Sequence, residues 1–336
     1  MKNIILFLFF ISIYSFSFSQ EKSKEPIKVT YGIFIKKIVP NFKDETFYAE
    51  FYWWVKFRND TAKSGLENTD IVDIQYVNSQ SSTSESEIEE EKYLGNNTYY
   101  YEGFHQGNFF FNPDYRQYPF DEQILNITIE NKLLPKSQLE YEIDTASFLF
   151  SGSKKDNFGL SNDVLANKNS NFKIEKSVIS TKEGIYNSNF GDVDFPSIST
   201  YSRIDVGVLI NRSFMPFITK LIIPLAIILF LVYFVFFIPA DKIDIAAGLT
   251  VTSLLSAIAF QLSVNSDLPD IGYIIYVDKV FYSCYFLIAI SMAESLYTFY
   301  LDKSGDEKKM NLALKIDVVS RFLFPLIFIG SVYLFA

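Results

Sequence analysis

Four long apolar stretches fill the second half of the chain and constrain its fold more than any other feature. They lie at about Phe214–Ile238, Asp241–Pro269, Tyr273–Tyr300 and Leu312–Ala336. As a helix, each is long enough to cross the ~30 Å hydrocarbon core of a bilayer. The sequence therefore predicts a bundle of four transmembrane helices over residues 212–336.

The second of these stretches is too polar for an ordinary lipid-facing helix. At about 3.6 residues per turn, its small and hydroxyl-bearing residues fall on one stripe, with a carboxylate at one end and leucines partway along. The stripe consists of Asp244, Gly248, Thr252, Leu255, Ser256, Ala259, Leu262, Ser263 and Ser266. Two interpretations are open: tight helix packing through small residues, or the lining of a water-filled pore ringed by copies of the helix.

Residues 1–19 have the pattern of a secretory signal peptide. Lys2 precedes a short apolar run, and Ser17 and Ser19 supply small residues before a predicted cut at Gln20. The alternative is a retained membrane anchor. Cleavage would leave the mature N-terminus outside the cytoplasm, and four crossings would then place the C-terminus outside as well.

The loop charges agree with this orientation. The predicted outer loop Ser266–Tyr276 contains no lysine or arginine, whereas the predicted inner loops contain Lys242, Lys303, Lys308 and Lys309.

Residues 20–211 are dominated by alternation of apolar and polar side chains. The pattern is clearest in Thr46–Phe57, Leu125–Glu130 and Arg203–Ile210. Shorter strand candidates are Val29–Ile38, Ile71–Val77, Leu139–Asp144 and Phe172–Ser180. About ten short strands with polar turns predict an antiparallel β-sandwich. The predicted fold class is therefore mixed: an extracellular antiparallel β-sandwich followed by a four-helix transmembrane bundle.

Several ionisable groups have two possible interpretations. The serine-rich and then acidic run Ser79–Glu91 is either a cation or proton sensor or a solvated loop. His105, the sole histidine, either titrates near neutral pH or is passive. Four residues in or near the apolar spans are interpreted as structural: Asp278, Lys279, Glu294 and Arg321.

Composition excludes several classes of function. A formal net charge of −9 argues against nucleic acid as a partner. The one cysteine, Cys284, permits no internal disulfide and no cysteine-based metal site. No nucleophile–base pair, phosphate loop or metal cluster is present in the sequence, so we expect neither an enzyme nor a bound cofactor or metal.

The motifs along the chain resemble those of one family. Tyr118-Pro119-Phe120-Asp121-Glu122-Gln123 resembles an aromatic-Pro-Phe-Asp-x-Gln signature, and Phe111 and Leu125 stand where eukaryotic members have two cysteines. Further matches are Arg212 before the first span, Pro224 within it, Leu255 at the hydrophobic gate position and Pro269 after the second span. This order resembles the pentameric ligand-gated ion channels, the Cys-loop receptor superfamily, in its prokaryotic branch without the loop disulfide.

The resemblance implies a homopentamer in a bacterial inner membrane, with the sandwich in the periplasm. Asp244 would form a carboxylate ring that favours monovalent cations, although Lys242 lies close enough to weaken the preference. Gly248 and Thr252 would line a hydrated stretch. An apolar constriction would be formed by Leu255, Ala259 and Leu262.

The resemblance also implies where agonist binding and coupling occur. The agonist would bind between neighbouring sandwiches, with Phe57 or its neighbour Trp54 supplied by the adjacent subunit. The principal face would offer Asn78, Glu130, Lys132, Tyr186, Phe190 and Phe195. Coupling to the pore would involve Tyr118, Pro119, Phe120, Asp121, Arg212 and Pro269, and the resemblance implies that Asp121 pairs with Arg212.

Two functions follow, and one question stays open. The first function is a ligand-gated, cation-selective channel, and the alternative is a non-conducting, membrane-anchored periplasmic ligand sensor of the same architecture. Lys132 stands where amine receptors commonly have tryptophan, which argues against a quaternary amine as agonist. Protons, divalent cations, small amines and organic acids remain possible agonists.

Overall fold

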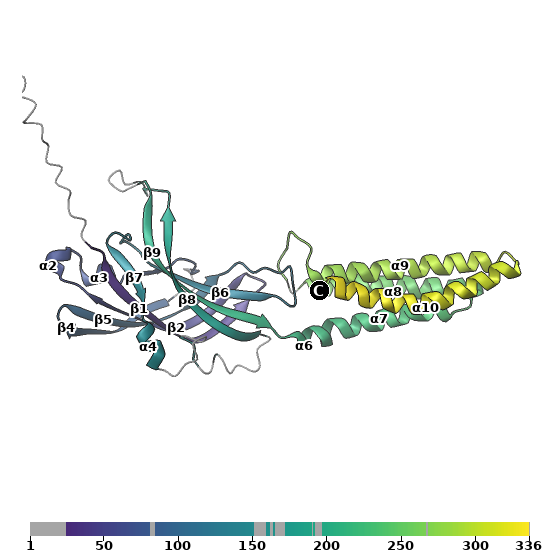
Figure 1. Cartoon of the computed structure of the whole chain (residues 1–336), viewed down its shortest axis with the longest axis horizontal. Helices are drawn as coiled ribbons and strands as arrows, with labels where there is room; N and C mark the ends of the chain where they lie inside the picture. The colour runs from purple at the N-terminus through teal and green to yellow at the C-terminus, as the bar shows by residue number, and fades with distance from the viewer. Residues whose placement is uncertain are drawn as a thin grey trace, which may run out of the picture.

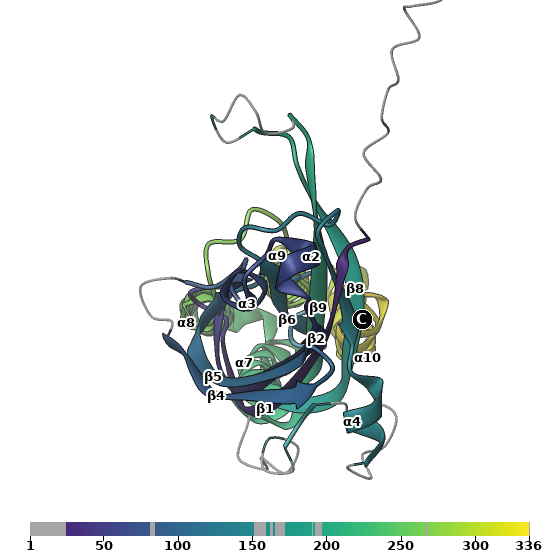
Figure 2. The ribbon, with the colours of Figure 1, turned by 90° about the vertical axis from the view of Figure 1, so that its left-hand side faces the viewer.

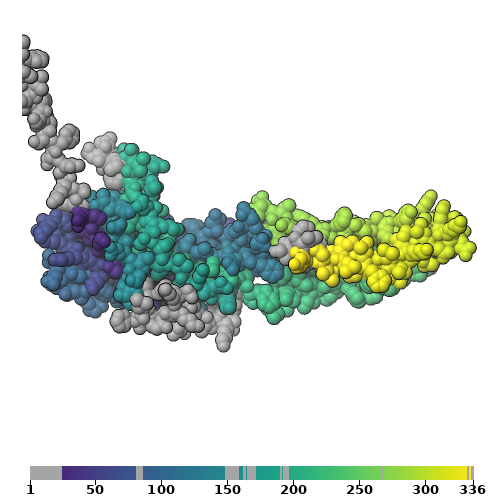
Figure 3. All heavy atoms as spheres, in the orientation of Figure 1, coloured from purple at the N-terminus to yellow at the C-terminus, as the bar shows by residue number. Residues whose placement is uncertain are grey.

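A computed structural model describes residues 25–80, 85–150, 159–161, 164, 172–189, 191, 197–266 and 268–335. The molecule is elongated, with two β-sheets at one end and a bundle of helices at the other (Figures 1 and 3). The predicted β-sandwich followed by helices is confirmed. The predicted signal peptide, Phe190 and Phe195 lie outside the described residues.

Nine strands are present in the described part of the chain. They are β1 (Ile27–Asn41), β2 (Thr46–Arg58), β3 (Ile74–Tyr76), β4 (Glu85–Gly95), β5 (Thr98–Phe110), β6 (Glu122–Asn131), β7 (Leu139–Ile143), β8 (Phe172–Tyr186) and β9 (Ser199–Arg212). One sheet has the order β4-β5-β2-β1-β7 and the other β3-β6-β9-β8. Figure 2 looks along the sandwich and shows the two sheets curving around a common interior.

One strand pairing departs from the antiparallel prediction. β1 and β7 run parallel, with Ile27 opposite Leu139 and Tyr31 opposite Ile143. All other pairings between the named strands are antiparallel. A parallel neighbour needs a long connection, and here the chain leaves β1 and returns only after five further strands.

The core of the sandwich follows the predicted alternation. On β2 the side chains of Phe47, Phe51 and Trp53 are buried between the sheets, while their neighbours point to the outer face. Gly103, opposite Trp53 on β5, leaves room for the indole, because a Cβ there would lie 2.5 Å from its ring. Burial of aromatic side chains of this size is the main stabilising contribution to such a core.

The acidic part of the run Ser79–Glu91 forms a strand, whereas residues 81–84 lie outside the described residues. Glu85–Gly95 forms β4, which pairs with β5 at the edge of the five-stranded sheet. Asn96 and Asn97 make the turn with positive φ angles of 50° and 58°, which asparagine tolerates better than most residues. Charged side chains on an edge strand discourage pairing with other chains.

The predicted strand Ile71–Val77 is shorter than expected. Only Ile74–Tyr76 forms β3, and the helix α3 (Asn68–Ile71) takes its first residue. Two other short helices flank the sheets, α2 (Thr61–Ser64) and α4 (Thr145–Phe150).

The helical end begins directly after β9. The first span is built from α6 (Phe214–Phe217), the π-helical turn η2 (Ile218–Ile222), α7 (Ile223–Tyr233) and the 3-10 turn η3 (Phe234–Phe237). The turn η4 (Ala240–Lys242) leads into α8 (Ile243–Asn265), followed by α9 (Tyr276–Asp302) and α10 (Glu307–Phe335).

Three of these segments are long and apolar enough to cross a membrane: Phe214–Phe237, Ala240–Asn265 and Tyr276–Asp302. The fourth predicted span corresponds to α10, which is 29 residues long and lies along α9 (Figure 1). The side chains of residues 331, 332, 334 and 335 lie outside the described set, so this crossing stays a prediction.

Candidate functional site

Helix α8 packs inside its own subunit through one narrow face. Ala246, Thr250, Ser253 and Ala257 are buried at spacings of four, three and four residues. The Thr250 hydroxyl donates to the Ala246 carbonyl at 2.9 Å and contacts the sulfur of Met292 on α9 at 3.2 Å. Small residues here allow α8 and α9 to approach closely.

The stripe singled out from the sequence lies on the opposite face of α8. At about 100° per residue, it is centred about half a turn away from the buried residues. Leu255 and Leu262 are 62% and 68% exposed, and a Cβ added to Gly248 would meet nothing within 4 Å. The remaining predicted pore residues, Asp244, Thr252 and Ala259, are exposed as well. Packing within one subunit therefore does not use this face.

The carboxylate end of the stripe is at the start of α8. Asp244 lies in the first turn, where the helix dipole favours a negative charge. Lys242, the cation expected to weaken a carboxylate ring, lies 3.5 Å from Asp241 through its Nζ atom. Asp244 has no ion pair among the described residues, so its charge is available at this end of the helix.

The other end of α8 is tied to α9 by polar contacts. The Gln261 amide donates to Asp278 at 2.8 Å, and the Tyr285 hydroxyl donates to Gln261 at 2.6 Å. Asp278, which the sequence analysis treats as structural, thus orients the two helices near the sandwich.

At the junction of sandwich and bundle, Asp121 and Arg212 form the expected ion pair. The Nε atom of Arg212 lies 2.8 Å from Asp121 Oδ1, and the two side chains are 14% and 1% exposed. The other carboxylate oxygen accepts from Gln123 at 2.6 Å. The guanidinium lies over the ring of Phe42 at 3.9 Å and near that of Tyr118 at 4.9 Å. The last residue of β9 is therefore fixed to the loop 111–121.

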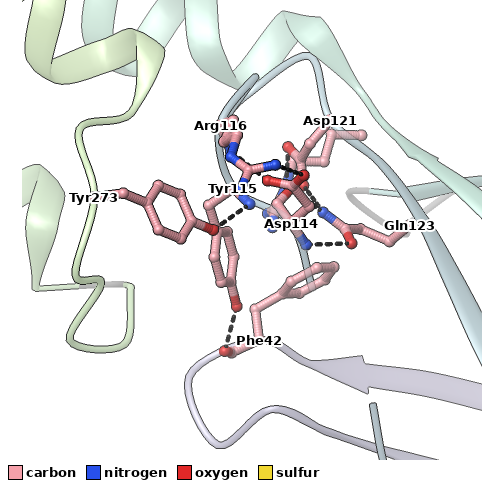
Figure 4. A network of polar contacts seen from close by, with 8 residues as sticks. Phe42, Asp114, Tyr115, Arg116, Asp121, Gln123 and Tyr273 are labelled. Carbon is pink, nitrogen blue, oxygen red and sulfur yellow. Dashed lines mark hydrogen bonds and ion pairs between the residues drawn. The ribbon is translucent and has the colours of Figure 1, made fainter. Parts of the chain in front are cut away.

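The same loop holds the connection between α8 and α9 (Figure 4). The backbone N–H of Tyr115 donates to the Tyr273 hydroxyl at 3.0 Å. The backbone N–H of Tyr276 donates to the Arg116 carbonyl at 3.1 Å. The Tyr115 hydroxyl donates to the Phe42 carbonyl at 2.7 Å, which adds the β1–β2 turn to the network. Tyr115, Arg116 and Tyr273 were not predicted individually from the sequence; for Tyr115 the available signal was an aromatic side chain beside the signature.

Phe120 adds a direct side-chain contact between sandwich and helices. Its ring lies edge-on to Phe217 of α6 at 5.1 Å and to Tyr276 of α9 at 5.6 Å. Tyr118 and Pro119 instead line a cavity beside Arg212. Pro269 lies half-buried in the α8–α9 connection.

The predicted agonist residues of the principal face are only partly brought together. Glu130 is buried and accepts from Arg203 Nε at 2.7 Å and from the Tyr186 hydroxyl at 2.5 Å. Arg203 also donates to the Tyr186 hydroxyl at 2.8 Å. Burial, together with the bond to Glu130, raises the pKa of Tyr186. Sequence reasoning missed Arg203, which neutralises this buried carboxylate.

Two other predicted residues lie outside this cluster. Asn78 is fully engaged with backbone, because its amide bonds Phe110, Asn126 and Thr128. Lys132 is exposed and lies 3.9 Å from Asp73.

The outer face of the five-stranded sheet has a cavity of about 900 Å³. Its wall includes Trp54, whose indole N–H donates to Asp144 at 2.8 Å, and the rings of Tyr52 and Tyr100. Hydrogen bonds from Trp54 and Ser147 lower the pKa of Asp144 against the opposing effect of its partial burial. Phe57 reaches the rim but is only 2% exposed, so Trp54 is the open aromatic side chain of this pair.

His105 lies between the sheets, against the rings of Tyr76 at 4.0 Å and Phe51 at 5.1 Å. Neither ring nitrogen has a hydrogen-bond partner among the described residues. Burial lowers its pKa from 6.5 to about 4. The residue is therefore neutral near pH 7 and lies apart from the clusters described above.

No protein-family model matches the chain. The chain is 24% identical over 216 residues to a protein of Gloeobacter violaceus named as a proton-gated ion channel. The match covers 64% of this chain and 53% of that protein, so the chain spans about half the length of the relative. This similarity supports the superfamily that the sequence motifs indicate.

Proposed function

We propose that the chain is one subunit of a homo-oligomeric ligand-gated channel, built from five copies and selective for monovalent cations. The observation that carries the proposal is the geometry of α8. Its small residues pack against α9, while its stripe from Asp244 to Leu262 faces away from its own subunit. Copies arranged around an axis would bring this stripe to water. The similarity to a protein named as a proton-gated ion channel supports a channel function.

Two parts of the stripe suggest how the channel selects ions and how it closes. Repeated around the axis, Asp244 forms a ring of carboxylates, and such rings favour cations. Leu255, Ala259 and Leu262 form an apolar constriction that closes by dewetting. The protein resides in a bacterial inner membrane, with its sandwich on the periplasmic side.

Agonist binding is assigned to the contact between neighbouring sandwiches. One copy supplies the buried Glu130–Arg203 pair capped by Tyr186, and the next copy supplies Trp54 from its outer-face cavity. Binding moves the β8–β9 hairpin, and β9 transmits the movement through Arg212 to the loop 111–121. The agonist shifts the closed–open equilibrium by its differential affinity for the open state.

Cysteine accessibility in a conducting assembly tests the pore assignment. In a Cys284→Ser background, Leu255→Cys and Gly248→Cys should react with a polar thiol reagent when the channel is open. Ala246→Cys, on the buried face of α8, is the matched control and should stay protected. Purified protein that passes no current in bilayers across a range of pH and a panel of metabolites would favour the non-conducting sensor instead.

Reversal potentials test the selectivity assignment separately. Asp244→Ala should reduce the preference for cations over anions, because it removes the carboxylate from every subunit. Asp306→Ala, in the α9–α10 connection, makes the same change of charge away from α8 and should leave selectivity unchanged. An unchanged preference in Asp244→Ala would refute the role of this residue.

A further inference from the structure

Three tyrosine side chains from both sheets meet in the interior of the sandwich. Tyr31 of β1 and Tyr141 of β7 belong to the five-stranded sheet, and Tyr76 of β3 belongs to the four-stranded sheet. Their exposed fractions are 1%, 2% and 8%, respectively. None of the three hydroxyl oxygens has a hydrogen-bond partner among the described residues. The agonist site and the junction with the helices use none of these three side chains.

The three hydroxyls are close together without bonding to one another. The rings of Tyr31 and Tyr141 meet edge to face, with their centroids 6.2 Å apart. Burial raises the pKa of Tyr31, and the neighbouring hydroxyls of Tyr76 and Tyr141 add to the rise. The groups therefore interact electrostatically, although no two of them have the geometry of a direct hydrogen bond. A bridging water molecule spans polar groups at such a separation.

Unpaired hydroxyls at this depth would destabilise the sandwich. A buried polar group without a partner has lost its hydrogen bonds to water, and the large majority of such groups in native proteins are paired. His105 adds two ring nitrogens that also lack a partner in the described part of the chain, and its ring lies 4.0 Å from that of Tyr76. Phenylalanine could provide the same rings without these polar atoms, so aromatic packing alone does not account for the tyrosines.

We propose that the sandwich binds an internal water molecule between the hydroxyls of Tyr31, Tyr76 and Tyr141. A buried water typically makes about three hydrogen bonds to groups of this kind. Each hydroxyl can both donate and accept, so the three can satisfy one water from both sheets. A neutral molecule fits this cluster better than an ion does, because the cluster offers hydroxyls and aromatic rings but no charge, and an unpaired buried ion is costly.

The bound water would connect β3 to the opposite sheet. β3 is three residues long and pairs with β6 at the edge of the four-stranded sheet. Tyr76 is its last residue, and Asn78 of the predicted principal face follows two positions later. A water that joins Tyr76 to β1 and β7 would fix the start of this segment. The inference concerns the interior of one subunit, so it depends neither on the number of copies nor on conduction.

X-ray radiolysis of the full-length protein, read out by mass spectrometry of its peptides, tests the site. Radiolysis converts bound water into hydroxyl radicals, which oxidise the side chains that the water touches even where these are buried. Tyr31 and Tyr141 should therefore be oxidised. Tyr115 is the matched control, because it is 1% exposed and its hydroxyl already donates to the Phe42 carbonyl at 2.7 Å. Oxidation of Tyr31 and Tyr141 at the slow rate of Tyr115 would overturn the proposal.

Phenylalanine variants measure what the hydroxyls contribute. Tyr31→Phe and Tyr141→Phe keep the rings and each remove one hydrogen bond to the water. Each should lower the melting temperature of the sandwich, followed by tryptophan fluorescence, by about 2–4 °C. The triple variant with Tyr76→Phe should lose less than the sum of the three single losses, because the water then leaves and no tyrosine hydroxyl remains unpaired.

Two other results would each overturn the proposal. A higher melting temperature in the single variants would show that the hydroxyls are unpaired in the wild type, because their removal would then relieve a cost. A lower melting temperature without oxidation of Tyr31 and Tyr141 would assign the hydroxyls to direct bonds with one another.

Discussion

Breaking the Asp121–Arg212 pair should destabilise the sandwich far more than breaking an exposed pair. Arg212→Gln leaves the Asp121 carboxylate 1% exposed, with Gln123 as its remaining side-chain partner. Removing one partner of a buried ion pair costs about 3–5 kcal/mol. At about 2–4 °C per kcal/mol for a domain of this size, the melting temperature should fall on the order of 10 °C.

The two tryptophans make this measurement specific. Trp53 and Trp54 are the only tryptophans in the sequence, and both lie on β2 of the sandwich. Thermal unfolding of the full-length protein, followed by tryptophan fluorescence, therefore reports the sandwich rather than the helices. Lys28→Gln is the control: it breaks the exposed pair with Glu142 and should change the transition little.

A double-mutant cycle gives the result that would refute this reasoning. Asp121→Asn combined with Arg212→Gln leaves no unpaired buried charge, so it should recover most of the stability lost in Arg212→Gln. Losses that simply add, with a coupling energy below about 0.5 kcal/mol, would show that the pair contributes nothing specific to the junction.

Three further changes have clear expected outcomes. The folded-state pKa of His105 is lowered from 6.5 to about 4, so ~3 kcal/mol of stability should be present above pH 6.5 and lost as the pH falls to about 4. His105→Phe should remove that dependence in denaturant unfolding at several pH values, and an unchanged pH slope would contradict it. Glu130→Gln should cost about 2–4 kcal/mol in thermal unfolding, because it leaves Arg203 without its buried carboxylate; a melting temperature equal to that of the wild type would exclude this. Arg321 donates through Nε and Nη2 to the Phe236 carbonyl at 3.0 and 2.9 Å, so Arg321→Met should loosen the end of the first span. Hydrogen exchange there should then increase, and identical protection would disprove the role of that contact.

The periodicity of apolar residues and the lengths of apolar runs made much of the fold predictable. Alternation along Thr46–Phe57 predicts a strand, and long apolar runs predict membrane helices, because both patterns are local consequences of backbone geometry. The stripe on α8 was also visible from the sequence, since 3.6 residues per turn fixes which side chains share a face. The pairing of Asp121 with Arg212 came from family resemblance rather than from spacing.

Contacts between segments far apart in the sequence could not be predicted from the periodicity of apolar residues. Alternation places Phe57 and Trp54 on opposite faces of one strand, but only the tertiary structure decided that Trp54 lines an open cavity. Arg203 neutralises Glu130 across two paired strands, and at a separation of 73 positions along the sequence no periodic signal indicates that pairing.

The sequence by itself determined the kinds of element, their order and the face of α8 that holds the polar stripe. These properties depend on each residue's own backbone and near neighbours. Tertiary structure alone decided that α8 turns its other face to α9, that Tyr115 meets Tyr273, and that Arg203 meets Glu130. Each of these depends on how separately formed elements close against one another, and that closure is set by the burial of many side chains together.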